Sequence, residues 1–208
     1  MTIIPAEHNH NDIYKLLIGS IVPRPIGFIS TVDPQGHRNL APFSFFSAVC
    51  SNPPVILFSP SIRKDSKVKD TLRNVQTTKE FVANIVSEDI AEQMNACSAE
   101  FPPEVDEFTV SGLTPLPSDA VKPARVKESL VQMECKLINI ITFGSGPGSG
   151  STVFGEVVRF HVADEILSNF RIDAGKLRAI GRMGGPTYAR TTDLFDMARP
   201  KTVENPGR

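Results

Sequence analysis

Two segments of the chain combine residue types that suit the binding of a charged or polar small molecule. The first, Phe58 to Thr71 (FSPSIRKDSKVKDT), leads from an apolar run through small hydroxyls, Arg63 and Lys64 into a helical pattern that starts at Asp65 or Ser66. Hydroxyls, two cations and the free N–H groups of a helix start together suit a phosphate monoester. A solvated basic turn with a simple N-cap fits the same residues, so this segment alone leaves both interpretations open.

The second segment is Asn39 to Ser47 (NLAPFSFFS), which mixes small polar residues with aromatic ones. Pockets for flat polar heterocycles combine apolar and aromatic walls with a few polar groups. An amphipathic core strand has the same composition. The segment therefore becomes informative only together with others.

Other motifs indicate no catalytic or metal site. The Gly/Ser loop at 144–151 (GSGPGSGS) matches neither the dinucleotide fingerprint nor the P-loop, and a strand pattern follows it. His8 and His10 alternate near Asp12, but no distant Cys/His pair completes a metal site. No GxSxG sequence is present, which argues against a hydrolase nucleophile. We therefore expect no metal and no catalytic side chain.

Composition describes an ordinary folded protein with one sizeable core. The chain has 208 residues, 40% of them hydrophobic and 22% charged, with a net charge of -1. That balance leaves no basic field for nucleic acid. The three cysteines, Cys50, Cys97 and Cys135, fit neither a disulfide framework nor a CxxC pair, so we expect a reducing, cytoplasmic setting.

Targeting and membrane signals are not seen in the sequence. The N-terminus carries Pro5, Glu7 and two histidines where a signal peptide needs a basic start and an apolar run. No uninterrupted apolar stretch reaches the length of a membrane helix. Seventeen prolines, fourteen glycines and thirteen phenylalanines predict many turns between short elements, and so a mainly β fold.

Hydrophobic periodicity positions the two polar segments among predicted elements. Helices are expected at 11–19, 65–76 and 87–97, and strands at 25–32, 43–49, 55–59, 81–86, 130–143 and 153–162. Asp33 to Gly36 (DPQG) is typical of a turn between two strands. The proline-rich stretch 100–127 is expected to be a surface excursion or lid, and 144–151 a mobile connector. Together these elements favour an antiparallel barrel with helices at its rim.

Taken in order, the motifs resemble a known family. They run RPIGFISTVDPQG, NLAPFSFFSAVCSNPPVILFS, RKDSKVKDTLRNV and EFVANIV, with VDEF, GEVV and RMGGPTYAR downstream. This series is similar to the flavin reductase-like family of FMN-binding split barrels, in its flavoredoxin-like branch, over residues 20–190. The resemblance implies a six-stranded antiparallel Greek-key barrel with peripheral helices, in a single domain over 1–208. It also implies a homodimer with the flavin near the subunit interface.

The resemblance also implies which residues hold FMN. Those expected at the isoalloxazine ring lie on two strands and the turn after them: Ser30, Thr31, Asn39, Ala41, Pro42, Ser44, Phe45, Phe46 and Ser47. Those expected at the ribityl chain and phosphate are Ser59, Arg63, Lys64, Asp65 and Ser66. Arg182, with Gly184, Gly185 and Tyr188 of the RMGGPTY motif, is expected to line the pocket.

The function implied is hydride transfer from NAD(P)H to FMN, followed by electron delivery to free flavin or another acceptor. The cofactor supplies this chemistry, so no catalytic side chain is assigned. In related flavin reductases a histidine turn precedes the GEV strand, whereas here the Gly/Ser loop precedes Gly155. Two alternatives remain: a non-catalytic FMN electron carrier that serves a protein partner, and a flavin-free binding module.

Overall fold

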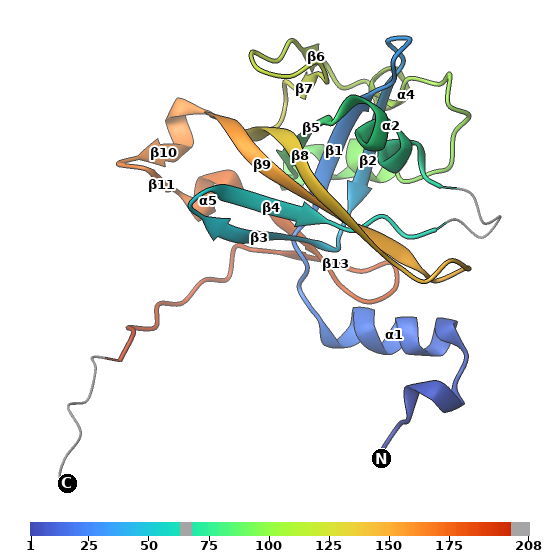
Figure 1. Ribbon diagram of the computed structural model, residues 1–208. Coiled ribbons are helices and arrows are strands. Elements are labelled where there is room, and N and C mark those ends of the chain that lie inside the picture. Colours follow the sequence, from blue (N-terminus) through green and yellow to red (C-terminus); the bar gives the residue numbers. More distant parts are fainter. Residues whose placement is uncertain (63–67, 201–208) are drawn as a thin grey trace, which may run out of the picture.

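The computed structural model describes residues 1–62 and 68–200, which form an antiparallel sheet surrounded by short helices (Figure 1). The main sheet contains β1 (Gly27–Val32), β2 (Arg38–Phe43), β3 (Phe46–Ser51), β4 (Pro54–Phe58), β5 (Glu80–Ile85), β8 (Val131–Phe143) and β9 (Gly150–Val162). The helices are α1 (His10–Ser20), α2 (Asp70–Thr78), α3 (Ala91–Ala96), α4 (Glu107–Ser111) and α5 (Ala174–Leu177), with 3-10 turns at Pro5–Glu7, Glu88–Ile90 and Asp164–Ile166. Three small pairs complete the fold: β6 (Pro115–Leu116) with β7 (Arg125–Val126), β10 (Leu167–Ser168) with β11 (Arg171–Ile172), and β12 (Ile180–Arg182) with β13 (Tyr188–Arg190).

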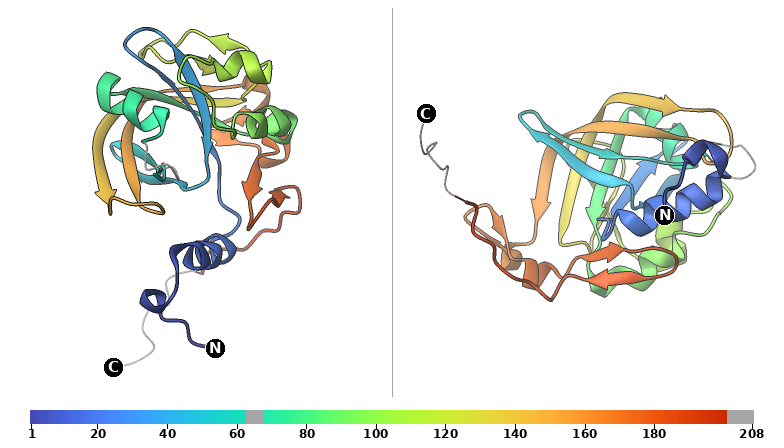
Figure 2. Two further views of the ribbon diagram at one scale, coloured as in Figure 1. Left: turned by 90° about the vertical axis from the view of Figure 1, so that its right-hand side faces the viewer. Right: turned by 90° about the horizontal axis from the view of Figure 1, so that it is seen from below.

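The sheet curls into a barrel because its two outermost strands follow each other in sequence. The strand order is β2-β1-β5-β8-β9-β4-β3, and only Ser44 and Phe45 connect β2 to β3 (Figure 2). The N–H of Ser59 donates to the carbonyl of Phe45 at 2.8 Å, which fixes this corner. The mainly antiparallel β architecture is confirmed, but the expected six strands are seven. The additional strand is β2, which the apolar pattern did not predict as a separate strand. β2 ends at Phe43 and β3 begins at Phe46, so the apolar run 43–49 contains the end of one strand and the start of the next.

Two hydrophobic cores lie on opposite faces of the sheet. All seven strands contribute to the first, including Ile29, Phe58, Phe81 and Val153, so this core fills the inside of the curl. The second core covers the outer face. It contains Phe28 of β1, the neighbour of Ile29, because successive residues of a strand face opposite sides.

The 100–127 segment differs from the expected surface excursion. Regular structure there is short, as the prolines predict, but Phe108, Leu113 and Val126 are buried in the outer core. The segment therefore forms a wall of the protein. An apolar residue every few positions is enough to anchor a segment that lacks helical or strand periodicity.

Two predicted helices begin later than expected. Helix α2 starts at Asp70 instead of within 65–66, and those two positions lie outside the described residues. Residues 87–97 form a 3-10 turn at Glu88–Ile90 before α3, and Ser87 makes no side-chain cap hydrogen bond. The position of α2 is set by tertiary contacts, because Thr71 and Asn74 of the helix form hydrogen bonds with side chains of β2 and β1.

The predicted turns and hairpins are largely confirmed. Asp33 joins β1 to β2 by accepting the N–H groups of Gln35 and His37, and Gly36 has a φ of +94°. Strands β8 and β9 form a long pair connected by 144–149, with β9 beginning at Gly150. Helix α1 extends from the barrel beside this end of the fold (Figures 1 and 2).

Candidate functional site

A first cleft lies between strand β2 and the start of helix α2, and we term it the α2 cleft. Its walls come from four parts of the chain: Asn39, Ala41 and Pro42 of β2; Lys69, Asp70 and Thr71; Cys97 to Phe101; and Glu107. Three of the predicted ring-binding residues, Asn39, Ala41 and Pro42, thus share one cleft with the start of α2.

Buried hydrogen bonds hold α2 against the sheet at this cleft. The side-chain amide of Asn39 donates to the Thr71 hydroxyl at 2.9 Å. The amide of Asn74 donates to the Thr31 hydroxyl at 3.1 Å. These polar pairs replace apolar packing where the helix crosses the strands, so the residue types of β1 and β2 serve the position of α2.

Ser30 and Thr31 line neither this cleft nor any other cleft that we describe. Both are fully buried, and they face opposite sides of β1. Thr31 is engaged by Asn74, whereas the Ser30 hydroxyl has no hydrogen-bond partner among the described residues. A role for these two side chains in flavin binding stays a prediction.

Glu107, which the sequence analysis did not select, contributes a buried carboxylate to the α2 cleft. It is 7% exposed, and the N–H of Leu40 donates to its Oε2 at 3.0 Å. Burial raises the pKa of Glu107 to about 7, and the carboxylates of Asp106 and Asp70 add to the rise. The VDEF motif was its only signal in the sequence.

A second cleft, the α1 cleft, adjoins the first on the other side of Pro42 and Ser98. Its lining residues come from α1, the segment between α1 and β1, β2 with the turn after it, α3 with the residues after it, and the 182–188 segment: Tyr14, Ile18, Arg24, Ile26, Pro42, Ser44, Met94, Asn95, Ser98, Arg182, Gly185 and Tyr188. Pro42 and Ser98 line both clefts, so the two are neighbours. The RMGGPTY motif thus belongs to the α1 cleft.

Arg24 organises the α1 cleft and was also missed from the sequence. This residue is 4% exposed, and its guanidinium donates to the carbonyls of Ile18 (2.7 Å), Ile21 (2.8 Å) and Met183 (2.9 Å) and to the Ser44 hydroxyl (3.3 Å). Backbone bonds between Arg24 and Arg182 add a bridge to β12. One side chain therefore connects three walls of the cleft.

Arg182 and Tyr188 face each other across the β12–β13 hairpin. The centre of the Arg182 guanidinium lies 4.4 Å from the centre of the Tyr188 ring. One nitrogen of Arg182 donates to the Gly185 carbonyl at 2.7 Å, and the Tyr188 hydroxyl donates to Asn95 at 3.3 Å. Gly185 has a φ of +60°, a conformation that favours glycine.

The remaining predicted residues lie in four places. Ser44 and Phe45 form the β2–β3 turn next to Arg24, with Phe45 partly exposed. Phe46 belongs to the inner core, while Ser47 is exposed and donates to the Ala48 carbonyl. Ser59 shares a hydrogen bond with Thr152 at 3.0 Å. Arg63, Lys64, Asp65 and Ser66 lie outside the described residues.

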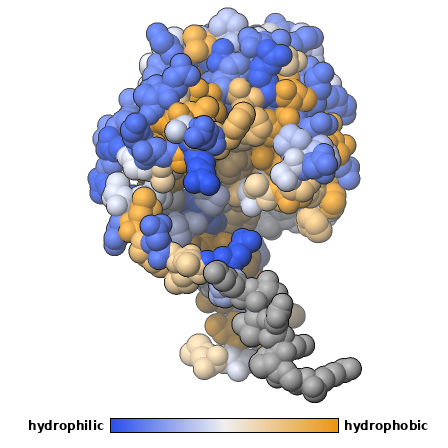
Figure 3. Space-filling view, turned by 90° about the vertical axis from the view of Figure 1, so that its left-hand side faces the viewer, coloured by the Kyte–Doolittle hydropathy of each residue, from blue (hydrophilic) through white to orange (hydrophobic). Residues whose placement is uncertain are grey.

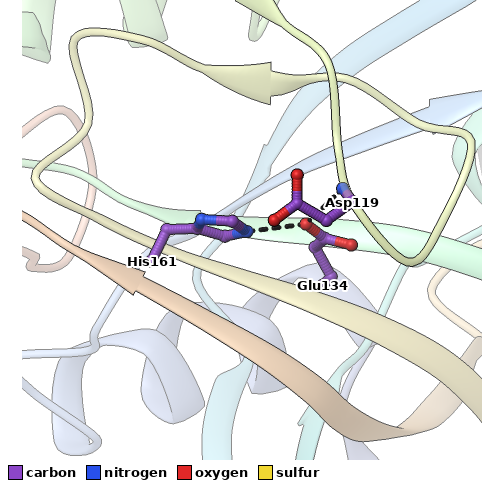
Figure 4. A group of neighbouring side chains, drawn as sticks. All are labelled: Asp119, Glu134 and His161. Carbon is purple, nitrogen blue, oxygen red and sulfur yellow. Dashed lines mark hydrogen bonds and ion pairs between the residues drawn. The ribbon is translucent and has the colours of Figure 1, made fainter.

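A separate polar cluster of Asp119, Glu134 and His161 lies on the outer side of β8 and β9 (Figure 4). The fully buried Glu134 accepts the N–H groups of Asp119 (2.8 Å) and Ala120 (2.6 Å), and it bonds to His161 at 2.6 Å. Burial opposes ionisation, but these hydrogen bonds outweigh it and hold the pKa of Glu134 below its ordinary value. The carboxylate thus anchors the 117–120 turn to the sheet.

The fold is an antiparallel barrel with two adjoining clefts, one of which is lined by two arginines. The chain belongs to the flavin reductase-like family, since the model named Flavin reductase like domain matches residues 18–180. Within the described residues, no helix is both long enough and apolar enough to cross a membrane.

Individual relatives agree with this family. An uncharacterized protein of Aquifex aeolicus is 44% identical over 91% of this chain and 95% of its own. The crystal structure of nitrilotriacetate monooxygenase component B from Bacillus cereus is 38% identical, with a TM-score of 0.91 over 95% of this chain and 98% of that one. The 2-nitrobenzoate 2-nitroreductase NbaA of Pseudomonas fluorescens is 31% identical, with a TM-score of 0.88 over all of both chains. The neighbouring structures share the split-barrel fold.

Proposed function

We propose that the chain binds FMN in the α2 cleft and reduces it with NAD(P)H, passing the electrons on to free flavin or another acceptor. The observation that carries the proposal is the convergence of β2 and the start of α2 on one cleft. The family resemblance assigns residues of β2 to the flavin ring. It assigns Ser59 and residues 63–66 to the ribityl chain and phosphate, and 63–66 precede α2 in the sequence and lie outside the described residues. Family membership supports the flavin itself.

The start of α2 suits the phosphate end of FMN. The first N–H groups of a helix have no partner within the helix itself, and the N-cap residue of α2, Lys69, makes no side-chain cap hydrogen bond. Helix N-termini attract anions through such N–H groups. The segment just before it carries Arg63, Lys64 and Ser66 in sequence, which supply further donors.

The outer edge of β2 suits a ring that donates hydrogen bonds. The N–H of Leu40 points away from β1, and Glu107 already accepts it. The next outward position is Pro42, which has no N–H. This edge therefore presents carbonyl oxygens, a fitting match for the ring N–H of an isoalloxazine.

Bound FMN would supply the hydride acceptor and the electron store for the reaction. The protein's own residues have the simpler tasks of holding the ring edge, receiving the phosphate and limiting water. No side chain is needed as an acid or base for the hydride step, so we assign no catalytic residue.

A visible spectrum tests the proposal directly. The purified protein is saturated with FMN, freed of excess ligand and titrated anaerobically with NADPH and then NADH. We expect retained flavin absorbance that either nucleotide bleaches within seconds. Flavin that stays oxidised would instead favour an electron carrier serving a redox protein, and a protein that never retains FMN would refute flavin binding altogether.

We also propose that the chain forms a homodimer through the exposed side of β8 and β9. The face drawn in Figure 3 shows apolar side chains between hydrophilic ones, so the folded chain exposes apolar surface. Ile141 and Phe143 are exposed near the end of β8, and neighbouring exposed apolar side chains mark interaction sites. Sedimentation should show a dimer that Phe143→Asp weakens, while Leu194→Asp, at an exposed site after β13, leaves it intact.

A further inference from the structure

The lining of the α1 cleft is unusual in its charge. It contains two guanidinium groups, Arg24 and Arg182, and two phenol rings, Tyr14 and Tyr188. Among the described residues no Asp or Glu lines it, although the neighbouring α2 cleft has three. The α1 cleft is therefore positive and has aromatic walls.

Arg24 carries a buried charge that is not balanced by an anion. All of its hydrogen-bond acceptors are neutral: three backbone carbonyls and the hydroxyl of Ser44. No carboxylate of the described chain forms an ion pair with it. Burial is the largest cause that lowers the pKa of Arg24; Tyr14 opposes the shift, and the nearby charge of Arg182 adds to it. Buried charges in proteins are normally paired, so this cleft favours an incoming anion.

Arg182 provides the accessible part of the same charge. Tyr188 supports its guanidinium from one side, and one nitrogen bonds to Gly185. Its other N–H groups have no partner in the described part of the chain. A planar guanidinium on an aromatic ring is suited to carboxylate or phosphate recognition.

We propose that the α1 cleft is a second binding site, which takes a flat aromatic molecule carrying a negative charge. This site rests on the proposed function, because its occupant would be the co-substrate of the flavin in the adjoining α2 cleft. Pro42 and Ser98 belong to both clefts, which places such a molecule beside the flavin. Two sources share the chemistry: a pyridine nucleotide, with its phosphates, and an aromatic carboxylate that accepts electrons.

The test measures binding by calorimetry on the FMN-loaded protein, with benzoate, its neutral isostere benzamide, and NADP⁺ as probes. We expect benzoate or NADP⁺ to bind. If the cleft recognises the carboxylate of benzoate, benzamide should bind at least about tenfold more weakly than benzoate. Arg182→Gln should weaken the charged probe by about tenfold or more. Arg190→Gln, which removes the same charge from the same hairpin but at its pairing with Glu88, should change it by less than about twofold.

The two arms separate the sources. Benzoate binding that Arg182→Gln weakens identifies an aromatic carboxylate site, and NADP⁺ binding that the same variant weakens identifies a nucleotide site. If Arg182→Gln fails to fold, Tyr14→Leu on the opposite wall serves in its place, because Tyr14 is 52% exposed and tolerates substitution.

Three results would overturn the α1 cleft as an anion site: neither charged probe binds, both bind equally to Arg182→Gln and the parent, or Arg182→Gln loses FMN and keeps the probes. The last result would show that Arg182 contributes to flavin binding, as the family resemblance implies, and not to a separate anion site. If the protein does not retain FMN, the same probes are titrated into the flavin-free chain. Probe binding then tests the α1 cleft, while the missing FMN refutes only the proposed function.

Discussion

The guanidinium of Arg24 donates to the carbonyl oxygen of Met183 at 2.9 Å, a bond between residues 159 positions apart. The same side chain also holds the end of α1, through Ile18 and Ile21. The RMGGPTY segment is therefore positioned by a residue near the start of the barrel. The α1 cleft should therefore be sensitive to a substitution at Arg24 that keeps the positive charge but removes the several N–H donors of the guanidinium.

Arg24→Lys should destabilise the protein by about 2 to 3 kcal/mol. A single ammonium group cannot reach three carbonyls and a hydroxyl, and buried acceptors left without a donor are costly. Urea unfolding measures the loss. Arg159→Lys is the control, because Arg159 is half-exposed with one partner, Asp119, and its change should stay below about 0.5 kcal/mol. Equal effects at the two sites would contradict the role of Arg24.

Glu107 should make the folded protein less stable as the pH rises from 4.5 to about 7. Its pKa is raised to about 7 in the fold from an ordinary 4.5, so over this range the folded state keeps a proton that the unfolded state has released. Stability is then greatest below the lower value and declines by about 3 kcal/mol through the higher one. Glu107→Gln should remove this part of the pH dependence in urea titrations, and parallel profiles for variant and parent would exclude it.

Glu134→Gln should cost about 2 to 4 kcal/mol. The amide keeps one acceptor oxygen and places an NH₂ group against N–H groups of Asp119 or Ala120, which leaves buried donors unpaired. Asp119→Asn is the matched control, because within the described part of the chain its half-exposed side chain bonds to Arg159 alone, and its backbone N–H is unchanged. Hydrogen exchange at 119–120 should quicken in the first variant alone.

The free energy of unfolding should depend on pH in opposite directions through Glu134 and Glu107. The pKa of Glu134 is lowered in the fold, so its stabilisation is present above the ordinary carboxyl pKa and lost as the pH falls through the lowered value. Glu134→Gln should therefore unfold with less acid dependence than the parent. An unchanged acid midpoint, relative to the stability at pH 7, would contradict the assignment.

Gly155→Ala should destabilise the barrel by about 1 to 3 kcal/mol through overpacking. A Cβ at Gly155 would clash with Cζ of Phe81, whose ring is fully buried and packs edge-on against Phe58. Gly19→Ala is the opposite case, because nothing lies within 4 Å and α1 gains helix propensity of about 1 kcal/mol. Thermal unfolding of the two variants should shift in opposite directions.

Lys64→Ala or Ser66→Ala should weaken FMN by about tenfold or more and leave riboflavin almost unaffected. The expectation follows from the phosphate role of the RKDS sequence, because a charged hydrogen bond contributes about 1.5 to 3 kcal/mol. Fluorescence titration with both flavins measures it, with the exposed Lys176→Ala as the control. Equal losses for the two ligands would contradict a phosphate contact.

Local sequence chemistry was sufficient for most of the fold. The pattern of apolar residues predicted six of the seven strands of the main sheet but not β2, and Asp33 with Gly36 predicted the turn of the first hairpin, because these patterns act between residues close in the chain. The motif order also predicted the family and grouped Asn39, Ala41 and Pro42, which do share one cleft.

Only the tertiary structure decided which polar residues are buried, and beside what. Glu107 accepts a hydrogen bond from Leu40, 67 positions away, and Arg24 donates one to Met183, 159 positions away. The Thr31 hydroxyl accepts a hydrogen bond from Asn74 of α2. No local pattern encodes such partners, because burial and its effects on charge depend on how distant segments pack. Hence the sequence was sufficient to indicate a barrel of the flavin reductase-like family, while the second, positive cleft beside Pro42 was visible only in the folded chain.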